Sequence, residues 1–443
     1  MTKMTFNQAY NFVLSLGNLP RLEYMRDPRH TGTYLKRIQF FLDMIGNPEK
    51  KIPHYIHVTG TSGKGSVTAY LHSILKASGQ KAGATFSPHP TYINERWKIG
   101  DHYMTKQEFV DLVTFLKPKL DQYIRLTPYD MLSFFELTEV LGLLWFARNK
   151  VKWAIMEVAC GGRYDATNII PRKDVAVITN VGVDHIGIIG NNKREIAYEK
   201  AGIIKPRCAV FTSERDKNIR AIFEKECRKN KVKMNVFNAP KFKLLASNFS
   251  ETTFLYNNEK YSLPMFGAHQ IKNAILCIEI AKHLKLKYQD IFQGLKKVDQ
   301  PLRLEIVGHN PLAILDAAHN PDKIKTTVAA IKQLKDIKNI YLILGSSENK
   351  NTRLMMKHLA SLKPKVVYCS RNTMNPFRKV LNPQTMAKEL KQLLPNTPTP
   401  IYLDPLEAWK VARDRAKKDD LILVTGSIFI SGELRGQLVK NTP

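Results

Sequence analysis

A glycine-rich turn joins a short apolar run to an amphipathic stretch in the segment 57–66, HVTGTSGKGS. The run over 55–59 has the length of a buried strand, and apolar side chains recur at helical spacing over 66–77. Glycines let a backbone come close to an anion, and the N–H groups at the start of a helix favour negative charge. This order of strand, glycine turn and helix predicts a phosphate-binding loop and is typical of α/β folds.

The turn departs from the common phosphate-loop pattern G-x-x-x-x-G-K-[S/T]. Gly65 follows Lys64 directly, so that Ser66 comes one position late. Lys64 still supplies a mobile positive charge beside the turn. A glycine turn with a solvated lysine is the alternative that this motif alone leaves open.

The length of the chain predicts two domains, because 443 residues exceed the size at which a single core stops growing. A hydrophobic content of 44% excludes a disordered chain, and no apolar run reaches the roughly 18 residues of a membrane span. The first residues, MTKMTFNQAYNFVLSLG, lack the basic and apolar segments of a signal peptide. We therefore expect a cytoplasmic protein.

Cysteine usage and net charge add two further expectations. The five cysteines are widely spaced without a C-x-x-C pair, so neither a disulfide framework nor a zinc site is indicated, and Cys160 is expected to be a small buried thiol. The net charge of +29 suggests a nucleic-acid partner, but Lys and Arg recur along the whole chain instead of forming one arm or stripe. A solvated basic surface and an attraction for polyanionic substrates stay open as interpretations, and no nucleic-acid or membrane partner is predicted.

Short apolar runs alternate with amphipathic stretches from residue 50 onward, which predicts a parallel sheet covered by helices on both faces. A hairpin with Asn257 and Asn258 in its turn is expected within 241–263. The other elements expected in this part are strands at 55–59, 82–86, 152–158, 175–180 and 207–212, and helices at 105–118, 133–149 and 267–284.

A domain boundary is expected between residues 298 and 299, where a charged connector interrupted by Pro301 follows a predicted helix. Residues 1–298 would form a larger α/β domain built on a parallel sheet, and 299–443 a smaller, Rossmann-like α/β domain. The elements expected in the smaller domain are strands at 312–316, 339–344, 365–369 and 420–425, and helices at 321–335, 384–393 and 405–417.

Polar side chains that could bind a metal ion follow or end several of the predicted strands. Glu157 closes one strand, Ser87 follows another, and His185 follows a third. Ligands collect outside the carboxyl ends of parallel strands, so these side chains should face one site. Magnesium prefers a few oxygen ligands and bridges nucleotide phosphates, which suits Ser87 and Glu157 better than the softer His185. A solvated glutamate and a packed histidine are the alternatives for each residue taken alone.

A second group of candidates lies near the domain boundary. Arg303, Asp316 and His319 cluster where the smaller domain begins, and a site at a domain junction can close around its substrates. Lys200 lies on a predicted helix in a chain rich in lysine, and by itself it indicates a surface amine.

Ten motifs occur in a fixed order along the chain: HVTGTSGKGS, FSPH followed by NER, SFFELTE, EVACGGRYDATN, ITNVGVDH, EKAGIIK, GAHQIKNA, PLRLE, LDAAHNP and TGSIF. They resemble the motifs of folylpolyglutamate synthases and the related bifunctional dihydrofolate synthases, within the Mur-ligase group of ATP-dependent amide-forming enzymes. The resemblance extends from about residue 31 to residue 434, and ten ordered motifs are far more specific than one loop.

The resemblance implies that ATP, Mg²⁺, L-glutamate and a folate or dihydropteroate bind a monomeric enzyme. It implies that residues 1–298 form the ATP-binding domain with the folate-side contacts and that 299–443 form the glutamate-ligase domain. It implies ATP contacts from Thr61, Gly63, Lys64, Gly65, Ser66, Asn273, Arg303 and Asp316. It implies that Ser87, Glu157 and His185 are magnesium ligands, and that Lys200 is carried as a carbamate (N6-carboxylysine), which turns a cation into an anion. Lys64, Lys200 and His319 would take part in catalysis, with His319 and Ser427 near the incoming glutamate, and Asn94, Glu95 and Arg96 match a motif near the folate side.

Three departures from the family pattern affect backbone geometry and leave the charged residues intact. Ser62 stands where the family commonly has Asn, Ala159 and Cys160 replace Gly-Leu, and Ala317 replaces Gly. They bear on substrate preference and not on the class of reaction.

The implied reaction begins with phosphorylation of the folate-side carboxylate by ATP, after which the amine of glutamate attacks the acyl phosphate. Three alternatives stay open: another Mur-type ligase acting on a cell-wall precursor, a nucleic-acid-dependent NTPase suggested by the charge, and a nucleotide-binding regulator without turnover.

Overall fold

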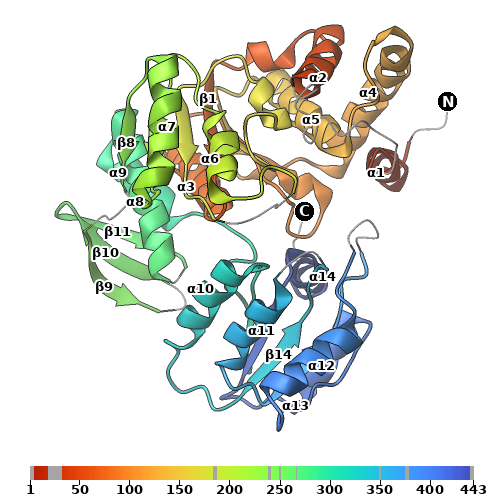
Figure 1. Ribbon diagram of the computed structural model, residues 1–443, viewed down its shortest axis with the longest axis vertical. Coiled ribbons are helices and arrows are strands. Elements are labelled where there is room, and N and C mark those ends of the chain that lie inside the picture. Colours follow the sequence, from red (N-terminus) through yellow and green to blue (C-terminus); the bar gives the residue numbers. More distant parts are fainter. Residues whose placement is uncertain are drawn as a thin grey trace.

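The computed structural model describes residues 4–17, 32–182, 187–237, 241–248, 251–265, 267–348, 351–374 and 379–439. It forms a larger and a smaller α/β domain, with the small sheet of β9, β10 and β11 at the side of the larger one (Figure 1). No helix in the described part of the chain combines the length and apolar character needed to cross a membrane. All five cysteines are described, and none forms a disulfide.

The larger domain is built on a sheet with the strand order β4-β3-β2-β5-β1-β6-β7-β8. Six neighbouring strands are parallel, namely β2, β5, β1, β6, β7 and β8. Strands β3 and β4 add an antiparallel edge that the sequence did not predict. The strands are β1 His54–Thr59, β2 Ala82–Thr85, β3 Trp97–Ile99, β4 His102–Tyr103, β5 Trp153–Glu157, β6 Val175–Ile178, β7 Ala209–Thr212 and β8 Met234–Val236.

Helices cover both faces of this sheet. Successive side chains of a strand point to opposite faces, so each strand packs against helices on both sides. In β1, Tyr55 packs with α1, α2, α4 and α5, whereas Ile56 and Val58 pack with α3, α8 and α9. Helices α6 and α7 cover the strands at the other end of the sheet. These helices are α1 Phe6–Ser15, α2 Thr33–Met44, α3 Lys64–Ala77, α4 Lys106–Leu126, α5 Phe134–Arg148, α6 Lys193–Ala201, α7 Lys217–Asn230, α8 Ala268–His283 and α9 Tyr288–Lys296, and 3₁₀ turns lie at Pro48–Lys51, Ile93–Arg96 and Ala166–Ile169.

Two predicted helix boundaries were wrong, each for a local reason. Helix α4 continues through Pro118 to Leu126, because the proline lies on the exposed side while Leu120 and Tyr123 continue the buried stripe. Helix α3 begins at Lys64 and not at Ser66, because Gly63 already caps it in the left-handed conformation with φ +85°.

The predicted hairpin is present and belongs to the small sheet. Strands β10 (Thr252–Tyr256) and β11 (Glu259–Leu263) pair antiparallel, and β9 (Lys243–Ser247) pairs with the other side of β10. Asn257 and Asn258 form the turn with φ of +49° and +62°, a conformation that asparagine tolerates better than most residues.

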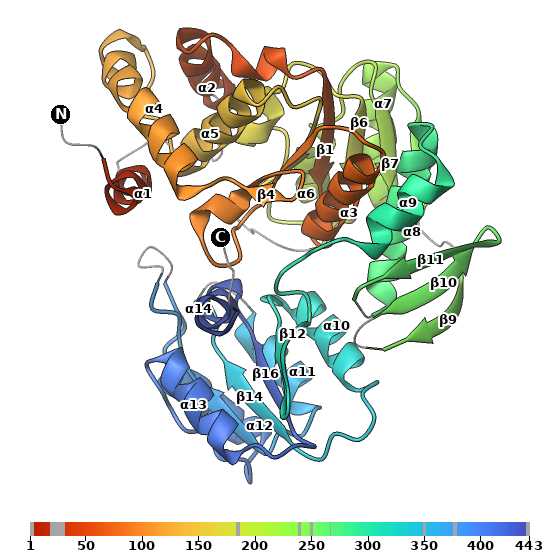
Figure 2. The same cartoon turned by 180° about the vertical axis from the view of Figure 1, so that it is seen from behind.

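The smaller domain has the strand order β12-β13-β16-β14-β15, parallel except for the edge strand β12. Helices α10, α11 and α12 cover one face, and α13 and α14 cover the other. Figure 2 shows β12 and α10 on the side toward the larger domain. The elements are β12 Glu305–His309, β13 Leu312–Leu315, α10 Pro321–Ile331, β14 Ile340–Leu344, α11 Thr352–Ala360, β15 Val366–Cys369, α12 Pro383–Leu393, α13 Pro405–Arg415, β16 Leu421–Thr425 and α14 Ile428–Leu438.

Candidate active site

The glycine turn lies between β1 and α3, as the sequence predicted, and its conformation depends on glycine. Gly60 has φ +146°, and a Cβ atom there would lie only 1.8 Å from the hydroxyl oxygen of Thr179. Lys64 folds back over the turn and donates from Nζ to the carbonyl oxygen of Gly60 at 2.9 Å. Thr61 accepts a hydrogen bond from the backbone of Gly182 at 2.9 Å, which ties the turn to the end of β6. The ammonium group and the start of α3 therefore face the same space.

Residues far apart in the sequence meet at this turn. A Cβ atom on Gly65 would lie 3.5 Å from both a carboxylate oxygen of Glu157 and a guanidinium nitrogen of Arg303. A Cβ atom on Gly63 would lie 2.8 Å from the amide oxygen of Asn273. The sheet edge, the interdomain connector and α8 thus bring three predicted site residues to the start of α3.

Glu157 is the buried carboxylate of this group, with 5% of its surface exposed. Its Oε2 atom accepts a hydrogen bond from the backbone N–H of Ser87 at 3.2 Å. Burial raises the pKa of Glu157, and the charges of Lys64, Arg303 and Lys323 act in the opposite direction. Glu157 is therefore a carboxylate that is largely shielded from water, and three positively charged side chains favour its ionised form.

The predicted magnesium ligands are only partly covered by the described residues. Ser87 and Glu157 lie together at the sheet edge, whereas His185 lies outside the described residues. Within the ranges that the structure describes, no three His, Cys, Asp or Glu side chains gather so as to hold a metal ion. Magnesium needs only one or two protein carboxylates when it also binds phosphates and water, so one buried carboxylate beside a phosphate loop fits this ion.

Lys200 is buried and not the surface amine that its position alone suggested. It has 3% of its surface exposed and lines a small cavity with Lys64, Thr61 and Cys160. Cys160 is only partly buried there, which corrects the expected fully buried thiol. The backbone of Arg163 donates to the carbonyl oxygen of Glu199 at 2.8 Å, which fixes the end of α6 against the segment after β5. Lys200 and Lys64 therefore face one cavity from different elements.

Two candidates in the smaller domain stabilise its local structure. Oδ1 of Asp316 accepts hydrogen bonds from the backbone of Ala318 at 3.1 Å and the hydroxyl of Thr327 at 2.7 Å, and Oδ2 accepts from the backbone of Leu304 at 3.3 Å. Asp316 thereby fixes the residue next to Arg303. Ser427 caps α14 by accepting from the backbone of Phe429 at 3.2 Å.

Two protein-family models match this chain over most of its length. Residues 58–281 match the Mur ligase middle domain, and residues 302–428 match the Mur ligase glutamate ligase domain. The folylpolyglutamate synthase of Lacticaseibacillus casei is 31% identical over 364 residues, which cover 79% of this chain and 82% of that protein. The dihydrofolate synthase/folylpolyglutamate synthase of Bacillus subtilis is 28% identical over 418 residues, which cover 91% of this chain and 94% of that protein.

The chain belongs to the folylpolyglutamate synthase/dihydrofolate synthase family of Mur ligases. It is accordingly an ATP-dependent glutamate ligase. The crystal structure of the Thermotoga maritima folylpolyglutamate synthase superposes with a TM-score of 0.81 at 27% identity, covering 98% of this chain and 96% of that one. The Mycobacterium tuberculosis enzyme complexed with ADP gives a TM-score of 0.86 at 24% identity, covering 99% of each chain, which shows the same fold.

The family's NER motif divides its residues between different tasks. Asn94 donates to the carbonyl oxygen of Met104 at 3.0 Å, and Glu95 accepts from the backbone of Tyr92 at 2.8 Å. Arg96 donates to a ring nitrogen of His89 at 3.2 Å, and burial lowers its pKa to about 10. Of the three, Arg96 is the residue whose charge interacts with those of Glu139 and Glu157.

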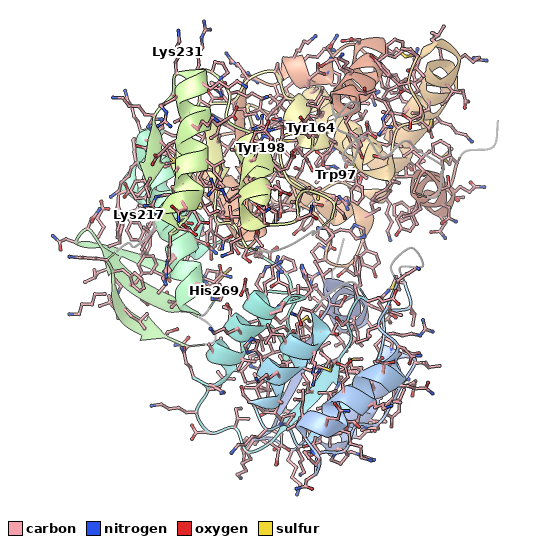
Figure 3. The ribbon with its side chains drawn as sticks, in the orientation of Figure 1. Trp97, Tyr164, Tyr198, Lys217, Lys231 and His269 are labelled. Carbon is pink, nitrogen blue, oxygen red and sulfur yellow. The ribbon has the colours of Figure 1, made fainter. Side chains whose placement is uncertain are left out.

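Sequence reasoning missed two buried titratable residues near the site, because only the fold brings them close to the other site residues. Burial, followed by the nearby Asp165, raises the pKa of Glu139 to about 8. Burial, followed by Arg303 and Lys272, lowers the pKa of His269 to about 4, and Figure 3 shows His269 at the start of α8, near the region between the two domains. Both residues lie within the ordered motifs, Glu139 in SFFELTE and His269 in GAHQIKNA, but the motifs by themselves assigned no role to either.

A buried ion pair joins the two domains of this folylpolyglutamate synthase family member. Arg435 of α14 donates to Oε1 of Glu95 at 2.9 Å across the domain boundary and to both carboxylate oxygens of Glu305 at 3.0 Å. The packing around it is tight, since a Cβ atom on Gly432 would lie 1.7 Å from the carbonyl oxygen of Pro90. Glu95 of the NER motif therefore holds the smaller domain against the loop after β2.

Replacing Arg435 with methionine should destabilise the protein by about 3–5 kcal/mol, because it leaves the buried Glu95 carboxylate without its partner. The free energy of unfolding measured by chemical denaturation tests this. The double variant Arg435→Met/Glu95→Gln should recover part of the loss, and Lys410→Met, which breaks the exposed pair with Glu407, should leave the stability essentially unchanged. Strictly additive effects of the two interface substitutions would contradict the pairing.

Proposed function

We propose that the protein adds L-glutamate to tetrahydrofolate and its polyglutamates through an acyl phosphate, with dihydropteroate as a further acceptor. The meeting of Lys64, Glu157 and Arg303 around Gly65 carries this proposal, because it joins a phosphate loop to a connector that leads into the glutamate ligase domain. The similarity to relatives named folylpolyglutamate synthase and dihydrofolate synthase supports the folate acceptor.

The two chemical steps follow from the poor reactivity of a carboxylate at neutral pH. A carboxylate oxygen of the acceptor attacks the γ-phosphorus of ATP, and the bond to the ADP oxygen breaks. The α-amine of glutamate then attacks the acyl carbon and loses a proton, and phosphate leaves with the former carboxylate oxygen. Lys64 and Arg303 stabilise the negative charge on the phosphoryl oxygens, where preorganised cations in a low-dielectric site act most strongly.

We assign the remaining ATP contacts to the turn residues Thr61, Gly63, Gly65 and Ser66 and to Asn273. Asp316 acts on ATP indirectly, since its hydrogen bond to the backbone of Leu304 positions Arg303. We assign His319 and Ser427, which follow β13 and β16 in the chain, to the incoming glutamate.

Ser87, Glu157 and His185 would hold a magnesium ion against the ATP phosphates. When bound, the ion would neutralise phosphoryl charge and orient the transferred group. The burial of Glu157 beside Gly65 supports this assignment.

Lys200 is proposed to be carried as a carbamate, formed when its neutral amine adds to the carbon of carbon dioxide and the nitrogen releases a proton to water. Burial beside Lys64 supports the proposal, because an anionic carbamate would relieve the repulsion between two ammonium groups in one cavity. The protein equilibrated with ¹³C-bicarbonate should give a carbamate carbon resonance that Lys200→Ala removes and Lys193→Ala, on the exposed start of α6, retains. A wild-type spectrum without that resonance would overturn the assignment.

We also propose the domain boundary, the oligomeric state and the location of the enzyme. We place the domain boundary between residues 298 and 299, ahead of Arg303. Both domains of one chain contribute candidate residues, which supports a monomer, and the use of ATP as substrate supports a cytoplasmic location.

An assay with labelled glutamate, ATP and magnesium tests the function directly. We expect labelled product and ADP in equal amounts with tetrahydrofolate, and product with dihydropteroate as well. Product with tetrahydrofolate alone would limit the protein to one activity. Product with a nucleotide-linked cell-wall precursor and with no folate would contradict the proposal.

Replacing Lys64 with alanine should lower kcat by roughly 10²–10³-fold, as expected when one charged donor to the transferring group is lost. The variant should remain folded, because the ammonium contacts only the carbonyl oxygen of Gly60 among the hydrogen bonds of the described chain. Lys76→Ala, on the same helix and paired with the exposed Asp101, should keep normal turnover. Near-normal activity of Lys64→Ala in the same assay would contradict its assignment to the phosphate site.

A further inference from the structure

The first turn of α10 brings the smaller domain against the phosphate loop. A Cβ atom on Gly182 would lie 3.1 Å from the side chain of Thr61 in the loop and 3.5 Å from a carboxylate oxygen of Asp322 in α10. Asn320 caps this helix by accepting from the backbone of Lys323 at 2.9 Å. Figures 1 and 2 both show α10 on the side of the smaller domain toward the larger one. Lys323 therefore lies in the helical turn that faces the loop.

His319 and Lys323 form a pair whose protonation follows from the hydrogen bonds. Nδ1 of His319 lies 2.8 Å from the carbonyl oxygen of Ala317, which can only accept, so Nδ1 carries the proton. Nε2 of a neutral ring is then an acceptor, and it lies 3.0 Å from Nζ of Lys323. Lys323 therefore donates this hydrogen bond, and the neutral ring of His319 accepts it. The positive charge at this position thus belongs to Lys323 and not to His319.

The charge of Lys323 reaches the same carboxylate as the two cations of the proposed phosphate site. Lys64, Arg303 and Lys323, in decreasing order, all favour the ionised form of Glu157. Lys64 comes from the loop, Arg303 from the connector and Lys323 from the smaller domain, so three different elements contribute the cations that act on this carboxylate.

We propose that Lys323 is a catalytic residue: its ammonium group, oriented by neutral His319, binds the phosphoryl oxygens during transfer to the acceptor carboxylate and on departure as phosphate. This inference rests on the proposed function. It also changes the role of His319, which becomes a positioning residue for Lys323. Because Lys323 belongs to the smaller domain, the phosphoryl site is complete only when that domain is in place.

Lys323→Met in the full-length protein tests the inference, with Lys325→Met as the matched control because Lys325 is exposed on the same helix. We expect Lys323→Met to lower kcat by roughly 100-fold or more, as for loss of one preorganised donor, with the KM for glutamate within about threefold of the wild-type value. Binding of the β,γ-methylene analogue of ATP should weaken by about tenfold, whereas binding of ADP should not change. Lys325→Met should match the wild type in all three measurements, and circular dichroism should show both variants folded.

Two results would overturn the inference. One is a kcat and an analogue affinity of Lys323→Met equal to those of the wild type. The other is a large rise in the KM for glutamate with unchanged kcat and unchanged analogue affinity, which would assign Lys323 to a glutamate carboxylate. If the wild type itself forms no ADP in the presence of glutamate and folate, the proposed function fails, and the binding of the analogue relative to ADP still decides whether Lys323 holds the terminal phosphate.

Discussion

The buried carboxylate of Glu157 constrains the whole site. An isolated carboxylate in a protein interior is strongly destabilised, so its ionised form requires cations close by. The structure provides them from the phosphate loop, the connector and the smaller domain, and each lies on a different element. The relative placement of the two domains is therefore linked to the charge state of one residue at the end of β5.

The central strands and the loop could be predicted from the sequence because their signals are local. Parallel strands that are buried on both faces occur in the sequence as short apolar runs. The turn after β1 can be recognised from its three glycines. The edge strands gave no such signal: β3 and β4 have only 3 and 2 residues, and the residues of β12 are partly exposed. Pro118 is a local signal too, and it suggested that the helix ends there. Helix α4 continues because Pro118 lies on the exposed face of the helix, which is apparent only in the folded protein.

The site was predictable as a set of residues and not as a set of contacts. The ordered motifs indicated Lys64, Glu157 and Arg303, and the fold brings them together at Gly65. Glu95 illustrates the limit, because its partner Arg435 lies 340 residues later in the chain. The protonation of His319 likewise depends on one backbone carbonyl and on Lys323, and a motif cannot specify either contact.

In the proposed mechanism both domains act on one phosphoryl group. This group moves from ATP to the acceptor carboxylate and then leaves as phosphate. The most direct measurement uses tetrahydropteroylglutamate labelled with ¹⁸O in its side-chain carboxylates, followed by mass analysis of the inorganic phosphate released in the presence of glutamate. An acyl phosphate transfers one carboxylate oxygen to phosphate, so each turnover should release phosphate that carries one labelled oxygen. Phosphate without label, formed together with the amide product, would contradict the account.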